Sequence, residues 1–232
     1  MKQNYFEPTW SSIKQHQTPN WFKKAKFGIY AHWGIYSVPA AGPNVTWYPY
    51  WMYRPPSPQF DYHCKHYGHP SKFGYKDFIP MFTAEKFNAE EWADLYYRSG
   101  AKFAGPVAEH HDGFPMWNCS DTEWCASKMG PKRDIVGELA KAIRNKGMKY
   151  MVAMHHAENW FFFPHWNNDF DTSKKEYESL YGELHNLDLI GNQAVYPDHW
   201  GRKNEHQDKP SKAFHDRWLN RLKEVVDNYR PD

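Results

Sequence analysis

The sequence predicts an α/β fold in which helices alternate with parallel strands. Two segments share one order: a helix, a glycine, a lysine, an apolar strand and a pair of histidines. Their glycines, Gly100 and Gly147, lie 47 positions apart. Repeated units of this kind build parallel sheets, whose buried strands are continuous apolar runs. A doubly wound sheet usually carries a glycine-rich phosphate turn after its first strand, and this sequence has none there. We therefore predict a (β/α)8-like TIM barrel, of which the chain carries about the first half.

The first strand is expected at residues 27–31, in a short alternating apolar segment that leads to His32 and Trp33. A long loop follows, "SVPAAGPNVTWYPYWMYRPPSP", which is rich in proline, tyrosine and tryptophan. Long loops inside compact domains usually carry function, so we expect this loop to contribute to a site. The next stretch, "FDYHCKHYG", is predicted to form a short helix within the same long connection.

A helix is expected from Asn88 to Gly100, because Asn88 can cap it, Glu91 sits three residues later, and glycine commonly ends a helix. The apolar run "AKFAGPVAEHH" then predicts a strand. The second unit repeats this order with a helix over 134–147 and a strand over 148–160. A last helix is expected over 211–229, with one apolar face made of Phe214, Trp218, Leu222, Val225 and Tyr229.

Composition narrows the possible functions. The 232 residues carry a net charge of +2, and no basic stripe points to nucleic acid. No segment approaches the ~20 apolar residues of a membrane span. The N-terminal segment does not resemble a signal peptide, which fits a cytoplasmic protein or an exported protein without its leader. Aromatic residues make up 19% of the chain, and flat aromatic surface can stack on the apolar face of a sugar.

Three expected strands end in histidine: His32 follows the first, His110 and His111 the second, and His155 and His156 the third. In a (β/α) barrel the carboxyl ends of the strands form the active-site rim. Adjacent histidines on a strand point to opposite faces, so one pair does not easily hold one metal ion. His-x-His, HExxH and GxSxG motifs are also absent from the sequence. We therefore predict no metal site and no Ser or Cys nucleophile.

The remaining chemistry is a pocket for a neutral polyol. A neutral imidazole offers one hydrogen-bond donor and one acceptor, as a sugar hydroxyl does, and a neighbouring Trp would cover the apolar face of the sugar. Given two carboxylates, the same pocket would support glycoside hydrolysis. Glu109 and Asp112 lie in the second rim segment, either as catalysts or as ion-paired and hydrogen-bonded supports.

Several segments together resemble the α-L-fucosidases of glycoside hydrolase family 29. They are "WFKKAKFGIYAHWGIYSVPA", "WYPYWMY", "AEHHDGFPMW" and "MGPKRDIVGELAKAIRNKGMKY", and the resemblance spans about residues 20 to 232. It implies a single catalytic barrel that begins after an N-terminal extension over 1–20. It also implies a retaining hydrolase that removes terminal α-L-fucose from glycans without a metal or an organic cofactor.

The resemblance also implies roles for particular residues. His32, His110 and His111 match the histidines of the family's His-Trp-Gly and His-His-Asp-Gly-Phe segments, which contact the sugar. His155 and either Trp33 or Trp47 are expected beside them. Residues expected to support these contacts are Glu109, Asp112, His156 and Trp160. The chain departs from the family at Thr46, where many members carry Glu, and at His156, where Ser is commoner.

In the resembled family the nucleophile lies on a strand after a Tyr-x-Pro-Asp-like turn, which here is "NYRPD". We therefore expect the nucleophile and the general acid/base to follow Asp232, and residues 1–232 alone to be inactive. Two alternatives remain open, which are a non-catalytic sugar-binding module on the same scaffold and a metal-dependent hydrolase.

Overall fold

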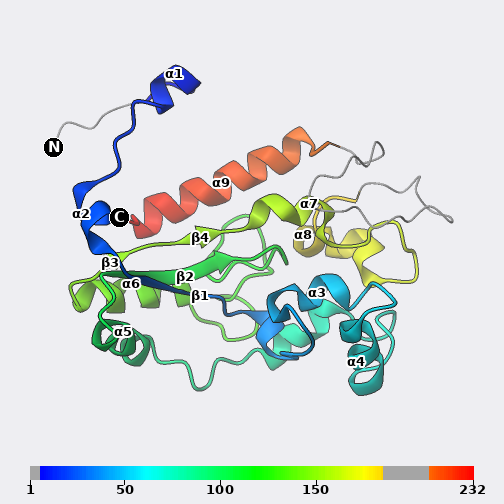
Figure 1. Ribbon diagram of the computed structural model, residues 1–232. Coiled ribbons are helices and arrows are strands. Elements are labelled where there is room, and N and C mark those ends of the chain that lie inside the picture. The colour runs from blue at the N-terminus through cyan, green and yellow to red at the C-terminus, as the bar shows by residue number, and fades with distance from the viewer. Residues whose placement is uncertain (1–5, 185–208) are drawn as a thin grey trace.

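The computed structural model describes residues 6–184 and 209–232. Its centre is a sheet in which β2 (Phe103–Glu109) pairs in parallel with three other strands. These are β1 (Gly28–Ala31), β3 (Lys149–Tyr150) and β4 (Ala153–Met154). Figure 1 shows the strands running side by side with helices around them. The predicted α/β class is therefore confirmed.

The third expected strand is shorter than predicted. β3 and β4 are two pieces that pair with successive parts of β2, and the register shifts between Val107 and Glu109. The last backbone contact runs from the His155 N–H to the Glu109 oxygen at 2.9 Å. Because β2 ends at Glu109, it offers the third strand no hydrogen-bonding partner beyond that residue. The third strand therefore ends there, and the chain continues as short helical segments. The prediction of a strand as far as residue 160 was wrong for this reason.

Close packing joins β2 to the third strand at Gly105. A Cβ atom placed on this residue would lie 1.7 Å from the backbone oxygen of Met151. Such a contact is impossible without moving the backbone, so the position requires glycine.

The longer helices begin where side chains can cap them. Asn88 accepts hydrogen bonds from the N–H groups of Glu90 and Glu91, and Asp134 and Ser211 cap later helices.

The longer helices are α4 (Pro58–His66), α5 (Ala89–Arg98), α6 (Ile135–Asn145) and α9 (Lys212–Tyr229). The short ones are α1 (Trp10–Ile13), α2 (Asn20–Ala25), α3 (Tyr48–Trp51), α7 (Asn159–Phe162) and α8 (Glu178–Tyr181). Short 3-10 helices occupy Ile35–Ser37, Val45–Trp47, Tyr75–Met81, His156–Glu158, Asp171–Ser173 and Lys175–Tyr177.

The strands are covered by helices, and their carboxyl ends are covered by excursions of the chain. α6 packs against β2 and β3, and α5 and α9 are its neighbours. The part of the excursion between β1 and β2 that contains α3 and α4 lies beyond the carboxyl ends of the strands, together with α7 and α8 (Figure 1). The long aromatic loop therefore reaches the end of the sheet where the histidines emerge.

The core is strongly aromatic, as the composition suggested. The buried residues of α6 include Val136, Leu139 and Ile143, as predicted from their spacing. On α9 the residues Phe214, Val225 and Tyr229 are buried, while Trp218 and Leu222 are half-buried. Large aromatic residues that fill the remaining core are Tyr48, Tyr75, Phe78, Trp117 and Tyr150.

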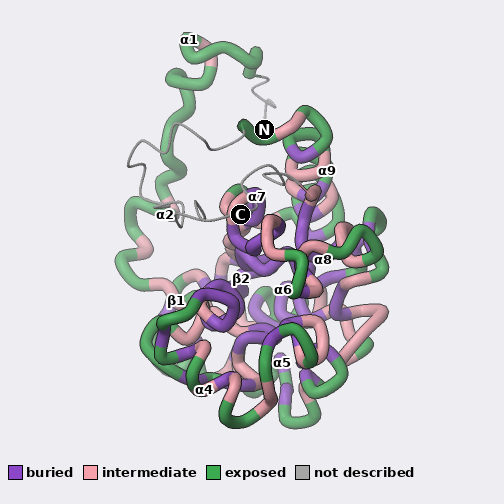
Figure 2. The backbone as a smooth tube through the Cα atoms, turned by 90° about the vertical axis from the view of Figure 1, so that its right-hand side faces the viewer, coloured by how far each residue is buried: buried purple, intermediate pink, exposed green. Residues whose placement is uncertain are grey.

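The start of the described chain lies apart from this core. α1 buries none of its residues and projects from the body in Figure 2. The expected extension over 1–20 stays a prediction, and its first five residues lie outside the described part. Among the described residues, no helix is long and apolar enough to cross a membrane.

Candidate sugar-binding site

His110 and His111 are placed by a tight turn at the end of β2. The Gly113 N–H donates to the His110 oxygen at 3.2 Å, and the φ angle of Gly113 is +76°. A Cβ on Gly113 would lie 2.5 Å from the Leu180 oxygen, so both the angle and the space require glycine. The turn holds the "HHDGF" segment against the sheet end.

Histidines from three strand ends converge, as the barrel-rim argument expected. The ring centroids of His32 and His110 lie 5.4 Å apart, and His155 lies 5.2 Å from the first and 5.0 Å from the second. His111 is also 5.1 Å from His155. Parallel strands bring these residues together because their carboxyl ends meet at one edge of the sheet.

The environment keeps three of these imidazoles neutral near pH 7. Burial lowers the pKa of His32. Burial, reinforced by the neighbouring histidines, lowers the pKa of His110 far below its ordinary value and that of His155 to about 4. Neutral rings retain a lone pair on one nitrogen and a proton on the other, which suits them to hydroxyl groups or to a metal ion.

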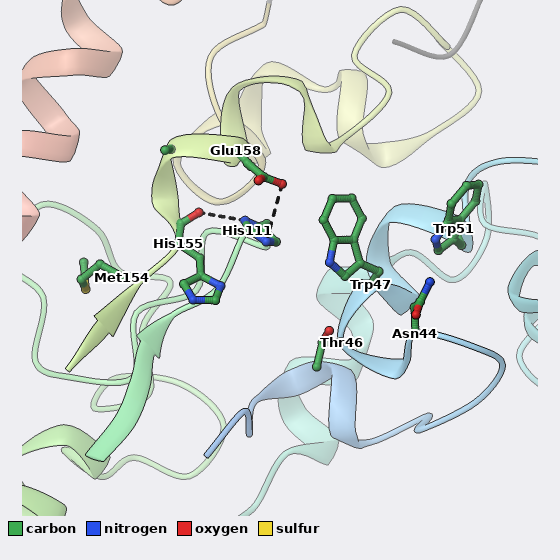
Figure 3. A pocket seen from close by; sticks show the side chains of 9 residues that line it. Asn44, Thr46, Trp47, Trp51, His111, Met154, His155 and Glu158 are labelled. Carbon is green, nitrogen blue, oxygen red and sulfur yellow. Dashed lines mark hydrogen bonds and ion pairs between the residues drawn. The ribbon is translucent and has the colours of Figure 1, made fainter. Parts of the chain in front are cut away.

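A cleft of about 630 Å³ opens beside this cluster (Figure 3). On one side His111 and His155 project from the strand ends, and on the other Trp47 and Trp51 project from the long loop. The Trp47 ring lies 5.1 Å from the His111 ring. The complete lining is Asn44, Thr46, Trp47, Trp51, His111, Met154, His155, Ala157 and Glu158.

The predicted sugar-contact residues occupy three different places. Trp47, His111 and His155 line the cleft, whereas His32 and His110 contact His155 and are not part of the lining. Trp33 lies elsewhere, because its ring packs 5.0 Å from both Phe82 and Phe87 and 5.2 Å from Trp92. The structure therefore places Trp47, and not Trp33, as the aromatic wall. Consecutive residues of an extended chain point to opposite sides, which separates Trp33 from His32.

Glu109 and His156 face away from the cleft, toward α9. The Nδ1 atom of His156 lies 2.7 Å from Oε1 of Glu109, and the fully buried Glu109 also pairs with Arg221. Burial raises the pKa of Glu109, but the nearby Arg221 and His156 outweigh it, so the pKa falls below its usual value. Trp160 supports the same region, with its ring 5.2 Å from Phe214.

Asp112 is buried beneath the turn. Its Oδ2 atom accepts a hydrogen bond from the Tyr75 hydroxyl at 2.7 Å, and its Oδ1 atom accepts one from the Phe114 N–H at 3.3 Å. Burial raises the pKa of Asp112 to about 7, although both hydrogen bonds oppose the shift. Asp112 is not among the residues that line the cleft.

Two residues with clear contacts in this region were not expected from the sequence. Glu158 brings a carboxylate to the cleft, 3.6 Å from Nε2 of His111, and its position shortly after a strand-end histidine was an available signal. Arg221 is buried between Glu109 and Asp121, with its Nη2 3.1 Å from the latter. The apolar spacing of α9 gave no indication that a charged residue would lie inside.

Comparison with known proteins agrees with the motifs. The model of the family described as Alpha-L-fucosidase matches residues 1–232. The chain belongs to the α-L-fucosidase family. Plasma alpha-L-fucosidase of Homo sapiens is 46% identical over 142 residues, covering 61% of this chain and 30% of that protein. Alpha-L-fucosidase of Dictyostelium discoideum is 37% identical over 188 residues, covering 78% of this chain and 40% of that protein. The chain thus spans about a third of the length of these family members.

Solved structures of the family show the same fold. The Thermotoga maritima alpha-fucosidase in complex with fucose superposes with a TM-score of 0.71 at 33% identity, over 98% of this chain and 48% of that one. The same enzyme in complex with a mechanism-based inhibitor gives a TM-score of 0.73 at 34% identity and the same coverage.

Proposed function

We propose that this chain carries the fucose-recognising part of a retaining α-L-fucosidase that releases terminal L-fucose from glycans. The observation that carries the proposal is the histidine cluster facing Trp47 across a cleft, in a member of the α-L-fucosidase family. The proposed partner is a fucosylated glycan.

Recognition follows from the polarity of the cleft. The His111 ring donates from Nδ1 to the His155 backbone oxygen at 2.9 Å, which orients the ring, and its Nε2 lies 3.6 Å from Oε2 of Glu158, so the two side chains together offer polar partners to a sugar hydroxyl. The neutral His155 ring offers a donor and an acceptor beside it. Trp47 supplies a flat apolar surface for the carbon face of the sugar. Thr46 contributes a hydroxyl where many family members carry a carboxylate.

Catalysis requires more carboxylates than the described cleft contains. A retaining glycosidase uses two carboxyl groups about 5–5.5 Å apart. Among the described residues that line the cleft, Glu158 is the one acid. Glu109 is engaged with Arg221, and Asp112 is buried under Tyr75. We therefore propose that both catalytic carboxyl groups follow Asp232, and that residues 1–232 bind fucose without hydrolysing it.

We also propose that the sheet is part of a (β/α)8-like barrel, with residues 20–232 forming the N-terminal portion of one catalytic domain. Support comes from the parallel order of the strands, from the histidines at their carboxyl ends, and from the solved fucosidases, of which this chain covers about half.

Two measurements on purified residues 1–232 test the proposal. Calorimetry should detect binding of L-fucose, with D-fucose as the matched control, and incubation with an aryl α-L-fucoside should release no aglycone. The absence of L-fucose binding would contradict the recognition role. Turnover at ~1–1000 per second, the range of ordinary enzymes, would contradict the placement of the catalytic groups and would point to Glu158 as one of them.

A further inference from the structure

Three histidines at the sheet end form a cluster with the dimensions of a metal site. His32, His110 and His155 each present one ring nitrogen, and these three atoms all lie within 4.8 Å of one another. Each residue follows a different strand, so the sheet itself brings the nitrogens together. Adjacent histidines on one strand point to opposite faces, and a cluster with one histidine from each of three strands avoids that restriction.

The same three residues have unused hydrogen-bonding capacity. The Nδ1 atoms of His32, His110 and His155 are buried and have no hydrogen-bond partner among the described residues. A buried polar atom without a partner costs about 1–3 kcal/mol, so a group that engages these nitrogens would stabilise the cluster. Imidazole nitrogen is a preferred ligand of Zn²⁺ and related divalent cations.

We propose that His32, His110 and His155 bind a divalent cation of intermediate softness, such as Zn²⁺. Zinc takes imidazole nitrogens at about 2.0–2.1 Å, and three protein ligands leave a fourth tetrahedral position open. Two nitrogens on one tetrahedral zinc are then about 3.4 Å apart. The rings therefore need to approach by roughly an ångström. His155 also lines the cleft, so the cation would lie beside it.

The cation and fucose should compete for the same residues, a consequence that rests on the proposed function. The cation would use the lone pairs of residues that are also expected to contact fucose, so metal and sugar would exclude each other. Zinc bound here would act as a competitive inhibitor of sugar binding. Metal binding itself does not depend on whether the cleft accepts fucose.

The experiment is calorimetry with ZnCl₂ on chelator-treated residues 1–232 in the absence of sugar. We compare the wild-type chain with His155→Gln and with the matched control His66→Gln, which removes an exposed histidine of α4 outside the cluster. Loss of one ligand should weaken zinc binding at least about tenfold, the lower end of the loss seen when groups around metal sites are removed. The control should bind as the wild type does. Circular dichroism of each variant confirms folding, and His32→Gln provides a second test of the same prediction.

The outcomes separate the two proposals. One-to-one zinc binding that both cluster variants weaken supports the metal site, whether or not L-fucose binds. Zinc binding that is absent in the wild type, or equal in all variants, overturns it. A separate L-fucose titration with and without ZnCl₂ tests exclusion, and zinc should weaken fucose binding in the wild type. Fucose binding that zinc leaves unchanged would contradict the shared use of these residues.

Discussion

The ring of His111 donates a hydrogen bond from Nδ1 to the backbone oxygen of His155 over 2.9 Å. This contact links the ends of β2 and β4 and fixes which ring nitrogen carries the proton. A backbone oxygen only accepts, so Nδ1 carries a proton, and the other ring nitrogen, Nε2, lies 3.6 Å from Oε2 of Glu158. The end of the sheet thereby presents an oriented imidazole beside a carboxylate at the cleft.

Replacement of His111 should weaken sugar binding. His111→Ala removes the oriented imidazole and leaves a sugar hydroxyl without its partner, which should cost about 1–3 kcal/mol in L-fucose affinity. Calorimetry measures the change, and His66→Ala on the surface of α4 serves as the control. Equal affinities for the wild type and His111→Ala would show that His111 only packs.

Removal of Arg221 should destabilise the fold. Arg221→Met leaves Glu109 buried without its cation, and breaking a buried pair typically costs about 3–5 kcal/mol. Arg217→Met on the same helix is the matched control, because Arg217 is partly exposed and lies 3.9 Å from Asp121, where at most about 1 kcal/mol is expected. Urea unfolding compares the two. Adding Glu109→Gln to Arg221→Met should restore part of the loss, and equal losses in the two single variants would contradict a role for the buried pair.

Asp112 should make stability fall as the pH rises from about 4 to about 7. Its pKa in the folded chain is raised to about 7, whereas an unfolded Asp titrates near 3.9. Between these values the folded state keeps a proton that the unfolded state has lost, so the free energy of unfolding decreases by up to about 1.4 kcal/mol per pH unit. The difference between the wild type and Asp112→Asn, measured by urea unfolding across this range, isolates the effect. A difference that does not change with pH would show that Asp112 titrates normally.

Much of the fold was predictable because local signals and packing agreed. The cap Asn88 lies where the sequence placed it, and Val136, Leu139 and Ile143 are buried as their spacing predicted. The convergence of the strand-end histidines also followed from parallel topology. These features depend on periodicity along the chain or on the rule that parallel strands end at one edge.

Other features depend on contacts between distant parts of the chain. The third strand stops at Met154 because β2 provides no further partner, and no property of the run "MKYMVAMHHAENW" reveals that limit. Trp33 was expected at the cleft, but Phe82, Phe87 and Trp92 provide its packing partners. Arg221 is buried because Glu109 and Asp121 meet it from other elements. Spacing on one helix or strand carries no information about such partners.

The excursion between β1 and β2 has a consequence for how relatives of this chain can diverge. It supplies Asn44, Thr46, Trp47 and Trp51 to the cleft, yet the strand ladder uses none of these residues. Substitutions on this wall can therefore change the shape and polarity of the opening while the register of the sheet is preserved. The histidine side of the cleft has less freedom, since the His111 ring donates to the backbone oxygen of His155 and so links the two strand ends. Diversification of the accepted glycan is expected to concentrate in the excursion.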